Sequence, residues 1–376
     1  MPQFSSTKRI AFFLPALHGG GAEKVAINLL QGMLSYDVSL DLVLASKEGP
    51  YLKQVPSQVR IVDLAAGRVI KAIAPLSRYL QHTQPDALLS HMNHANAIAA
   101  IAKVLASTDN RLVLVEHDTL SVAKSKLLRA KLLPLFMKWL YPHADAIVGV
   151  SQGVTADLAK LLAIAPHKLR TIYNPVVDDQ LMTQAKALPA HSWLQDSSVP
   201  VFLAVGRLTI QKDFATLIQA FALLRKRRQA RLLILGEGEA RQELEALIQK
   251  LGIAEDVALP GFVDNPYAYM SRAAALVLSS RWEGLPTVLI EAMACGCPVV
   301  STNCPSGPEE ILAAGKYGVL VPTGDVSALA TAMVEILDQP TSQELLIQRA
   351  QDFSLHQAVP QYLALLGYKK CSTVRK

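Results

Sequence analysis

The sequence contains little cysteine and little charge for its length. Four of the 376 residues are cysteines, and 18% of the residues are charged. Cys295, Cys297 and Cys304 cluster loosely while Cys371 stands apart, and no histidine or cysteine at zinc-site spacing joins them. We therefore expect reduced thiols in a cytoplasmic protein, not a disulfide framework. Because 51% of the residues are hydrophobic, the composition also excludes a disordered chain.

Long apolar runs are missing as well. No stretch of about 18 uninterrupted apolar residues occurs, which argues against a membrane-spanning helix. Lys8 and Arg9 precede an apolar run over 10–17, as in a signal peptide. That run leads into Gly-Gly-Gly-Ala-Glu-Lys and not into a small-residue cleavage site. We therefore expect a cytoplasmic chain and not a secreted one.

The fingerprint of dinucleotide-binding proteins, G-x-G-x-x-G, is also absent. The glycines at 19–21 follow a predicted strand, but Lys24 occupies the place of the last glycine. Gly236 and Gly238 follow another predicted strand, and there Arg241 takes that place. These departures remove most of the support for hydride transfer with NAD.

Positive charge is concentrated in the first half of the chain. Residues 1–174 hold 19 Lys and Arg against 11 Asp and Glu, whereas 175–376 hold 18 against 20. The first half is therefore expected to face an anionic partner. In the segment Lys124–Tyr141, five cations alternate with leucines and aromatics, which favours anionic lipid over nucleic acid. We expect peripheral contact with the inner face of the cell membrane there; an ordinary surface helix is the alternative.

Short apolar runs alternate with helix-period segments along the whole chain. The runs are continuous and do not alternate in polarity, which indicates parallel strands covered on both faces. The pattern breaks at Asn174-Pro175 and restarts at Val201. We expect an α/β protein with two Rossmann-like domains, at 1–174 and 175–354, whose parallel sheets face each other across a ligand-binding cleft.

The segment from Arg281 to Met293 carries two carboxylates around a Gly-Leu-Pro turn. Glu283 stands at the end of a predicted strand, and Glu291 lies about two turns into the next predicted helix. A helix N-terminus favours a phosphate, and carboxylates accept hydrogen bonds from sugar hydroxyls. The combination suggests a sugar nucleotide as ligand.

Two cations follow the predicted strand 201–205. Arg207 and Lys212 lie five residues apart, at the strand's carboxyl end, where they could neutralise a diphosphate and assist its departure. Taken alone, such a pair is usually solvated. No D-x-D motif offers ligands for a bridging metal, so we expect these cations and the helix N-terminus to offset the charge without one.

The first half offers His117 and the glycine loop. His117 follows the predicted strand 111–115 and could exchange a hydrogen bond with a sugar hydroxyl, with Glu116 and Asp118 tuning it. Gly20 lets the backbone approach a phosphate or sugar. A capping histidine and a tight turn are the alternatives. His91 and His94 stand in similar positions after a strand, as candidates on the acceptor side.

Several motifs together resemble glycosyltransferase family 4, the retaining enzymes of GT-B fold. They are Gly-Gly-Ala-Glu near the start, Gly-Arg-Leu with Lys212 at 206–212, Leu-Pro-Gly-Phe-Val at 259–263, and Glu-Gly-Leu-Pro-x4-Glu at 283–291. The resemblance covers nearly the whole chain. With Cys-Pro-Ser-Gly-Pro-Glu-Glu-Ile at 304–311, it is greatest to bacterial members that build lipid-linked oligosaccharides or surface polysaccharides.

This resemblance implies a role for each matching position. Arg207 and Lys212 would bind the donor diphosphate, Glu291 the ribose, and Glu283 the transferred sugar. Domain 1–174 would bind the acceptor, domain 175–354 the nucleotide sugar, and a final helix at about 355–376 would pack back on the first domain. The implied catalytic residues are His117 and Glu283, and the implied donor-binding residues are Gly20, Arg207, Lys212, Phe262, Val263, Glu283, Gly284, Leu285, Pro286, Thr287 and Glu291.

The expected activity is retaining transfer of a hexose or N-acetylhexosamine, without metal or cofactor, from a UDP-linked donor to a lipid-linked or lipopolysaccharide-type glycan. A sugar-nucleotide epimerase or a phosphorylase of the same fold is the alternative enzyme. A module that binds a nucleotide sugar without turnover is disfavoured because Arg207, Lys212, Glu283 and His117 are all present.

Overall fold

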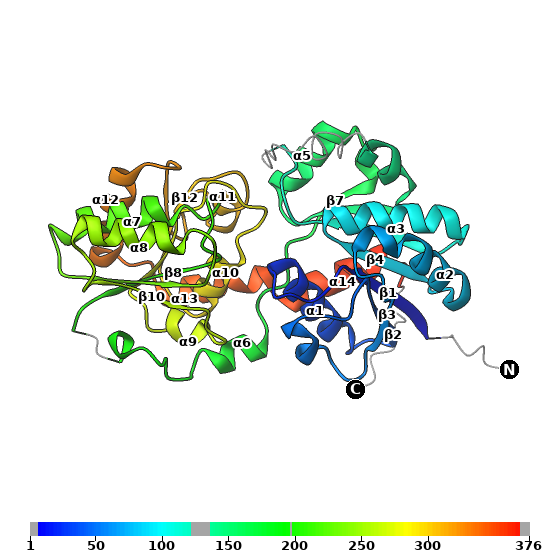
Figure 1. The fold of residues 1–376 in the computed structure, drawn as a ribbon, viewed down its shortest axis with the longest axis horizontal. Coiled ribbons are helices and arrows are strands. Elements are labelled where there is room, and N and C mark those ends of the chain that lie inside the picture. The colour runs from blue at the N-terminus through cyan, green and yellow to red at the C-terminus, as the bar shows by residue number, and fades with distance from the viewer. Residues whose placement is uncertain (1–6, 122–135, 196–197, 369–376) are drawn as a thin grey trace. The chain divides into compact units, whose positions relative to one another are not determined.

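A computed structural model describes residues 7–121, 136–195 and 198–368. The chain divides into two compact units. The N-terminal unit comprises Met1–Pro175 together with Leu355–Lys376, and the C-terminal unit comprises Val176–Ser354. The boundary thus lies one residue after the predicted one, and the last helix belongs to the N-terminal unit (Figure 1).

The N-terminal unit alternates strands and helices along the chain. Its first strand carries the glycine loop at its carboxyl end, and its last helix comes from the end of the sequence. The elements are β1 (Lys8–Leu14), α1 (Gly21–Met33), β2 (Val38–Leu44), β3 (Arg60–Asp63), α2 (Ile73–Thr83), β4 (Ala87–His91), α3 (Asn93–Ala106), β5 (Arg111–Glu116), β6 (Ala146–Gly149), α5 (Gln152–Leu162), β7 (Leu169–Thr171) and α14 (Leu355–Leu365).

The C-terminal unit repeats this alternation after the short helix α6 (Asp179–Gln184). Its first strand, β8 (Val201–Val205), has the bounds predicted from the sequence. The remaining elements are α7 (Phe214–Arg225), β9 (Arg231–Leu235), α8 (Arg241–Leu251), β10 (Val257–Gly261), α9 (Tyr267–Met270), β11 (Ala275–Leu278), α10 (Thr287–Ala294), β12 (Val299–Thr302), α11 (Pro308–Ile311), β13 (Val319–Val321), α12 (Val326–Asp338) and α13 (Gln343–Ala350).

Each unit contains one sheet, and the two sheets share a strand order. The seven strands of the N-terminal unit run β3-β2-β1-β4-β5-β6-β7, and the six of the C-terminal unit run β10-β9-β8-β11-β12-β13. Neighbouring strands are parallel, as the pairing of Phe12 with Leu42 and Leu89 illustrates. The order reverses between β1 and β4 and between β8 and β11. In doubly wound sheets, ligands bind at the carboxyl ends of the strands beside that reversal.

Helices cover both faces of each sheet, which explains the continuous apolar strands. In the C-terminal unit, α7, α8 and α12 lie on one face and α10 and α13 on the other (Figure 1). Phe202, Phe221 and Met333 belong to one buried apolar cluster that joins β8, α7 and α12. Burial on both faces leaves only the strand ends and loops for polar chemistry.

Three edge strands and the helices α2, α6, α9, α11 and α13 were not predicted from the sequence. The strands β3, β7 and β13 are three or four residues long and only partly buried, so they lack a continuous apolar run. Helix α2 has few apolar residues on its buried side, which is limited to Leu76, Ser77, Tyr79 and Leu80.

The last helix packs on the first. Figure 1 shows α14, in red, beside α1. At the contact, Gly32 of α1 leaves room for α14: a Cβ there would lie 2.7 Å from Val359 Cγ2 and 3.1 Å from Leu355 Cδ2. Gly32 therefore permits this close approach, although glycine disfavours a helix interior.

The Gly32→Ala substitution is expected to destabilise the N-terminal unit. Alanine gains up to about 1 kcal/mol of helix propensity, but overpacking against Val359 costs about 1–3 kcal/mol. Thermal unfolding of Gly32→Ala, Val359→Ala and the double variant measures the balance. The penalty of Gly32→Ala should shrink in the Val359→Ala background, and equal penalties in both backgrounds would show that the two residues do not clash.

Candidate functional site

The site in the C-terminal unit centres on an ion pair between two loops. Lys212 follows β8 and Glu283 follows β11, the two strands at which the sheet order reverses. Lys212 Nζ lies 2.6 Å from Glu283 Oε1, and the two side chains are only 18% and 9% exposed. Gly206 lets the lysine stem pass, because a Cβ there would approach Lys212 Cε to 3.1 Å. The pair thus brings together two residues that are 71 positions apart in sequence.

Glu283 is fixed by further hydrogen bonds. Ser280 Oγ donates to the same carboxylate oxygen at 2.6 Å. The backbone N–H of Glu283 donates to the carbonyl of Pro305 at 2.7 Å, and its own carbonyl accepts from the N–H of Ser306 at 3.0 Å. Among the described residues, the second carboxylate oxygen, Oε2, has no hydrogen-bond partner in the protein, so it can accept from a ligand hydroxyl.

A second ion pair joins the same two loops. Asp213, next to Lys212, is 5% exposed and accepts from Arg281 Nε at 2.9 Å and Nη2 at 3.2 Å. Gln211 adds a hydrogen bond from Nε2 to the carbonyl of Trp282 at 2.9 Å. Arg–carboxylate pairs of this fork geometry resist reorientation. The two loops are therefore also held together by contacts that do not involve the side chains of Lys212 and Glu283.

The turn after Glu283 leads directly into α10. Gly284 and Leu285 are buried, and the Gly284 carbonyl accepts from Ser306 Oγ at 3.0 Å. Pro286 occupies the N-cap of α10 and provides no side-chain cap, so the first-turn amides of Thr287 and Val288 are available to an anion, whereas that of Leu289 donates to the Pro286 carbonyl. Glu291 lies in the second turn of α10, half-buried, on the helix that begins beside the ion pair.

Three further predicted residues lie on loops of the same unit. Arg207 follows β8 and is exposed, and among the described residues its guanidinium makes no ion pair. Phe262 and Val263 follow β10, the edge strand. Phe262 is 70% exposed, which is unusual for so large an apolar side chain. An exposed aromatic ring of this kind offers a flat surface for a base.

The site in the N-terminal unit contains two histidines in contact. His91 ends β4 and His117 follows β5; His91 Nδ1 and His117 Nε2 are 3.0 Å apart. His91 is fully buried and its ring stacks on Phe12 at 6.1 Å between centroids. Burial lowers the pKa of His91, and it lowers the pKa of His117 to about 4, so both rings are neutral at pH 7.

Glu116 contacts other groups and not His117. Its carboxylate accepts from Asn96 Nδ2 at 2.8 Å and from the hydroxyl of Tyr141. All three side chains are buried. Because burial disfavours the carboxylate more than these bonds favour it, the pKa of Glu116 is raised to about 7. The hydrogen bonds of Glu116 join β5 to α3 and to the turn at Tyr141. Glu116 therefore does not contact His117 as expected, and His91 does.

The glycine loop is closed by its own acid. Glu23 Oε2 accepts from the backbone N–H of Gly19 at 2.7 Å and of Gly20 at 3.1 Å, and Glu23 is 8% exposed. Gly19 needs its φ of +105°, a conformation that favours glycine. A Cβ on Gly21 would meet nothing within 4 Å, so space is open there. Gly20 is therefore held in place by Glu23.

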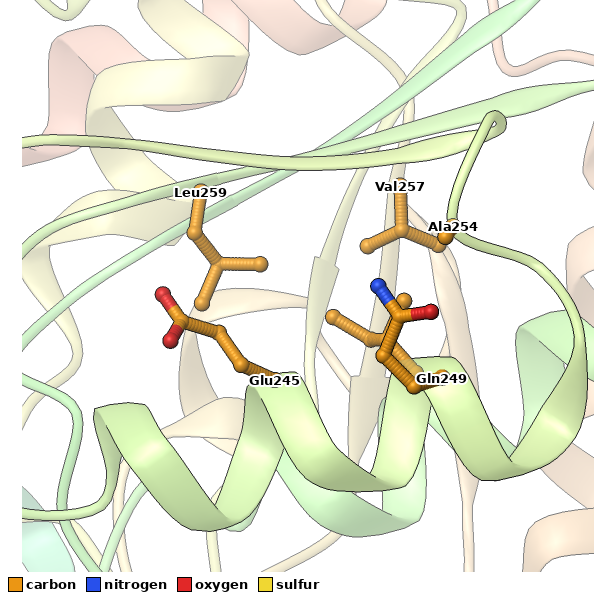
Figure 2. Close-up of a pocket in the computed structure, with 6 residues that line it drawn as sticks. Glu245, Gln249, Ala254, Val257 and Leu259 are labelled. Atoms are coloured by element: carbon orange, nitrogen blue, oxygen red, sulfur yellow. The ribbon is translucent and has the colours of Figure 1, made fainter.

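A separate hollow lies on the outer side of the C-terminal sheet. Figure 2 shows it between α8 and the edge strand β10, lined by Glu245, Gln249, Ala254, Val257 and Leu259. The volume of this hollow is about 200 Å³. None of the predicted site residues lines it. Within residues 7–121, 136–195 and 198–368, no three His, Cys, Asp or Glu side chains are grouped so as to hold a metal ion.

The sequence predicted Lys212 and Glu283 as site residues but not the side chains that hold them. It did not identify Asp213, Ser280 or the role of Arg281, which hold Lys212 and Glu283 in position. The only available signal was that each of these polar residues lies within three positions of a predicted site residue. Pairing between loops far apart in sequence cannot be read from that pattern.

Two α/β units with parallel sheets, each with polar residues at the carboxyl ends of its central strands, define the architecture of GT-B glycosyltransferases. Two family models match the chain: "Glycosyltransferase Family 4" over residues 19–180 and "Glycosyl transferases group 1" over residues 191–353. The chain belongs to glycosyltransferase family 4. The resemblance expected from the sequence is thereby confirmed.

Two curated relatives from Campylobacter jejuni match nearly the full chain. The N-acetylgalactosamine-N,N'-diacetylbacillosaminyl-diphospho-undecaprenol 4-alpha-N-acetylgalactosaminyltransferase is 32% identical, with 88% of this chain and 90% of the relative covered. The transferase named for GalNAc-alpha-(1->4)-GalNAc-alpha-(1->3)-diNAcBac-PP-undecaprenol is 25% identical, with 96% and 99% covered. Both are named as sugar transferases that act on diphospho-undecaprenol glycans.

Solved structures agree with the predicted fold. The lipopolysaccharide outer core galactosyltransferase WaaB superposes with a TM-score of 0.73 at 21% identity, with 96% of this chain and 99% of that chain covered. Anabaena HepE in complex with UDP superposes with a TM-score of 0.77 at 20% identity, with 96% and 100% covered. The expected GT-B fold is therefore confirmed.

Glu116→Gln is expected to raise the stability of the protein, relative to wild type, more at pH 8 than at pH 5. A pKa raised from 4.5 to about 7 makes the protonated acid favourable below about pH 4.5, and this contribution is lost as the pH rises through 7. Glutamine keeps both hydrogen bonds without a charge. Between pH 5 and 8, the unfolding free energy of the variant should gain about 2–3 kcal/mol on that of the wild type. Denaturation at both pH values measures it, and the exposed Glu48→Gln should show no such gain.

Proposed function

We propose that the chain transfers a hexose or N-acetylhexosamine from a nucleotide sugar to a lipid-linked or lipopolysaccharide-type glycan. Family membership supports glycosyl transfer in general. The names of the two Campylobacter relatives support a glycan on a lipid diphosphate as acceptor. The observation that carries the donor assignment is the Lys212–Glu283 pair beside the start of α10, because it combines a cation, an acid and free amides.

The donor diphosphate is expected to bind Arg207, Lys212 and the first-turn amides of α10. Two cations and a helix N-terminus together favour a dianion. Lys212 already has a carboxylate partner in Glu283, so the diphosphate would bind to an ion pair and not to an unpaired lysine. Gly284, Leu285, Pro286 and Thr287 shape the turn that presents those amides.

The sugar, ribose and base take the remaining groups. Glu283 Oε2 is expected to accept from hydroxyls of the transferred sugar, since Oε1 is engaged by Lys212 and Ser280. Glu291 accepts from the ribose hydroxyls, and Phe262 with Val263 lies against the base. The N-terminal unit supplies His117 for a sugar hydroxyl and Gly20 for close backbone approach. UDP is the proposed nucleotide, because a structural neighbour was solved in complex with UDP.

The proposed mechanism retains the configuration at the anomeric carbon. The acceptor hydroxyl attacks the anomeric carbon on the face from which the diphosphate leaves, and a departing phosphate oxygen takes its proton. Glu283 stabilises the positive charge that develops on the sugar, while Lys212 and Arg207 stabilise the negative charge on the leaving group. These two cations perform the charge compensation that a metal ion performs in other transferases, so we propose that no metal or cofactor is needed.

Contact with an anionic membrane is proposed as well, at a cytoplasmic location on the inner face of the cell membrane. The predicted segment Lys124–Tyr141 lies outside the described residues up to position 135. Its last part, residues 136–141, is described. There Phe136 is 61% and Trp139 81% exposed, with the exposed Lys138 between them. Aromatic and basic side chains together favour the interface of anionic bilayers. None of the helices in the described part of the chain has the length and apolar character to cross a bilayer.

The activity can be tested directly with UDP- and GDP-sugars and a bacterial membrane lipid extract. Mass measurement of the lipids should show the addition of one sugar, and the anomeric configuration of the product should match the donor. The rate should be unchanged by EDTA. Sugar phosphate release dependent on inorganic phosphate would indicate a phosphorylase, and donor conversion without acceptor would indicate an epimerase; either result would overturn the proposal.

The double variant Lys212→Met/Glu283→Gln is expected to lose transfer, by about 10³-fold or more, because it removes charge stabilisation on both sides of the breaking bond. Removing both charges avoids leaving one of them buried and unpaired. The matched control is Arg225→Gln/Asp256→Asn, an ion pair of the same unit that lies away from the site. The control should keep transfer, and equal turnover in both double variants would exclude the proposed donor site.

Phe136→Ser/Trp139→Ser is expected to weaken vesicle binding by about tenfold or more, because two exposed aromatic rings no longer enter the bilayer interface. Co-sedimentation with phosphatidylcholine vesicles, with and without phosphatidylserine, measures it. The exposed Leu345→Ser in α13 is the control and should bind like the wild type. Unchanged sedimentation of the aromatic variant, or equal binding to neutral vesicles, would refute anionic membrane contact here.

A further inference from the structure

The contact between His91 and His117 restricts which ring nitrogen of His117 can meet a ligand. His117 Nε2 lies 3.0 Å from His91 Nδ1 and is therefore engaged within the protein. Nδ1 is the other ring nitrogen. Any hydrogen bond from the imidazole to a ligand must therefore use Nδ1, and its direction depends on which tautomer His117 adopts.

The buried environment of His91 selects the tautomer. Both rings are neutral, so each carries one proton, and one of the two facing nitrogens must donate. His91 Nε2 is buried and has no hydrogen-bond partner among the described residues. If His117 donated, His91 would carry its proton on Nε2, as a buried N–H without an acceptor. If His91 donates, Nε2 is only an unused lone pair, and unpaired buried N–H groups are the rarer of the two.

We infer that His91 is a positioning residue: its Nδ1–H donates to His117 Nε2 and thereby fixes His117 as the tautomer protonated on Nδ1. His117 then presents a hydrogen-bond donor to its ligand. The matching ligand group is an oxygen lone pair, such as that of a sugar hydroxyl. His117 does not act as a general base in this arrangement, because its only basic nitrogen is occupied by His91.

Neighbouring side chains hold His91 in this orientation. Its ring stacks on Phe12 of β1 with 13° between the planes, and both residues are fully buried. Glu116, the nearest acid in sequence to His117, is hydrogen-bonded to Asn96 and Tyr141. His94 is turned to Asn93, with its Nδ1 at 3.2 Å from Asn93 Oδ1. Contact with the ring of His117 thus comes from His91.

Two variants of similar size separate the hydrogen bond from the packing. In His91→Asn, the side-chain amide can place a donor where Nδ1 was, whereas His91→Leu has the same branching without a donor. The first readout is the ring ¹⁵N chemical shifts of His117 at pH 7.5, assigned by comparison with His117→Gln. Wild type and His91→Asn should show protonated Nδ1, and His91→Leu should show a mixture or protonated Nε2.

The second readout is transfer kinetics, and the role in catalysis rests on the proposed function. The kcat of His91→Leu should fall by about tenfold or more, and that of His91→Asn should stay within about threefold of wild type. His82→Leu, an exposed histidine at the end of α2, is the control and should behave as wild type.

The two readouts fail separately. If wild-type protein transfers no sugar, the proposed function is refuted, while the ¹⁵N shifts still decide the tautomer. If His117 carries its proton on Nε2 in the wild type, or if its shifts are the same in His91→Leu and wild type, the inference is wrong. A lower melting temperature in both His91 variants with unchanged shifts would show a purely structural residue and would also overturn it.

Discussion

The ion pair between Lys212 and Glu283 is the interaction on which the proposed donor site depends. A largely buried lysine requires a partner, and the acid at 2.6 Å provides it while keeping one oxygen free. Each charge therefore offsets the desolvation cost of burying the other. The Asp213–Arg281 pair joins the same two loops without passing through either residue, and Ser280 donates to the Glu283 carboxylate. The loops after β8 and β11 are thus held in a fixed relation before any ligand arrives.

The two units have similar sheets but carry different chemical groups at the ends of their central strands. Both sheets reverse their strand order at the centre, and both gather polar residues at the carboxyl ends of the strands beside that point. The C-terminal unit places charged pairs there, which suits a diphosphate. The N-terminal unit places two neutral histidines of lowered pKa there, beside a glycine loop in which Glu23 accepts from the amides of Gly19 and Gly20. Neutral groups of this kind suit hydroxyls.

Much of the fold could be predicted from the sequence because buried parallel strands leave continuous apolar runs. The bounds of β8 follow from such a run, whereas β3, β7 and β13 are too short and exposed to leave one. Lys212 and Glu283 were identified as candidates, but their direct contact was not, because it joins loops 71 residues apart. The partner of His117 was also misjudged, since adjacent Glu116 turns to Asn96 and Tyr141.

The placement of α14 has a consequence for how the chain folds during synthesis. The N-terminal unit is discontinuous: its first segment ends at Pro175, and its last helix begins at Leu355, after the whole C-terminal unit. A ribosome therefore releases the α1 surface around Gly32 long before its covering helix exists. The C-terminal unit can complete its core first, and the unit that begins synthesis is the last to be finished.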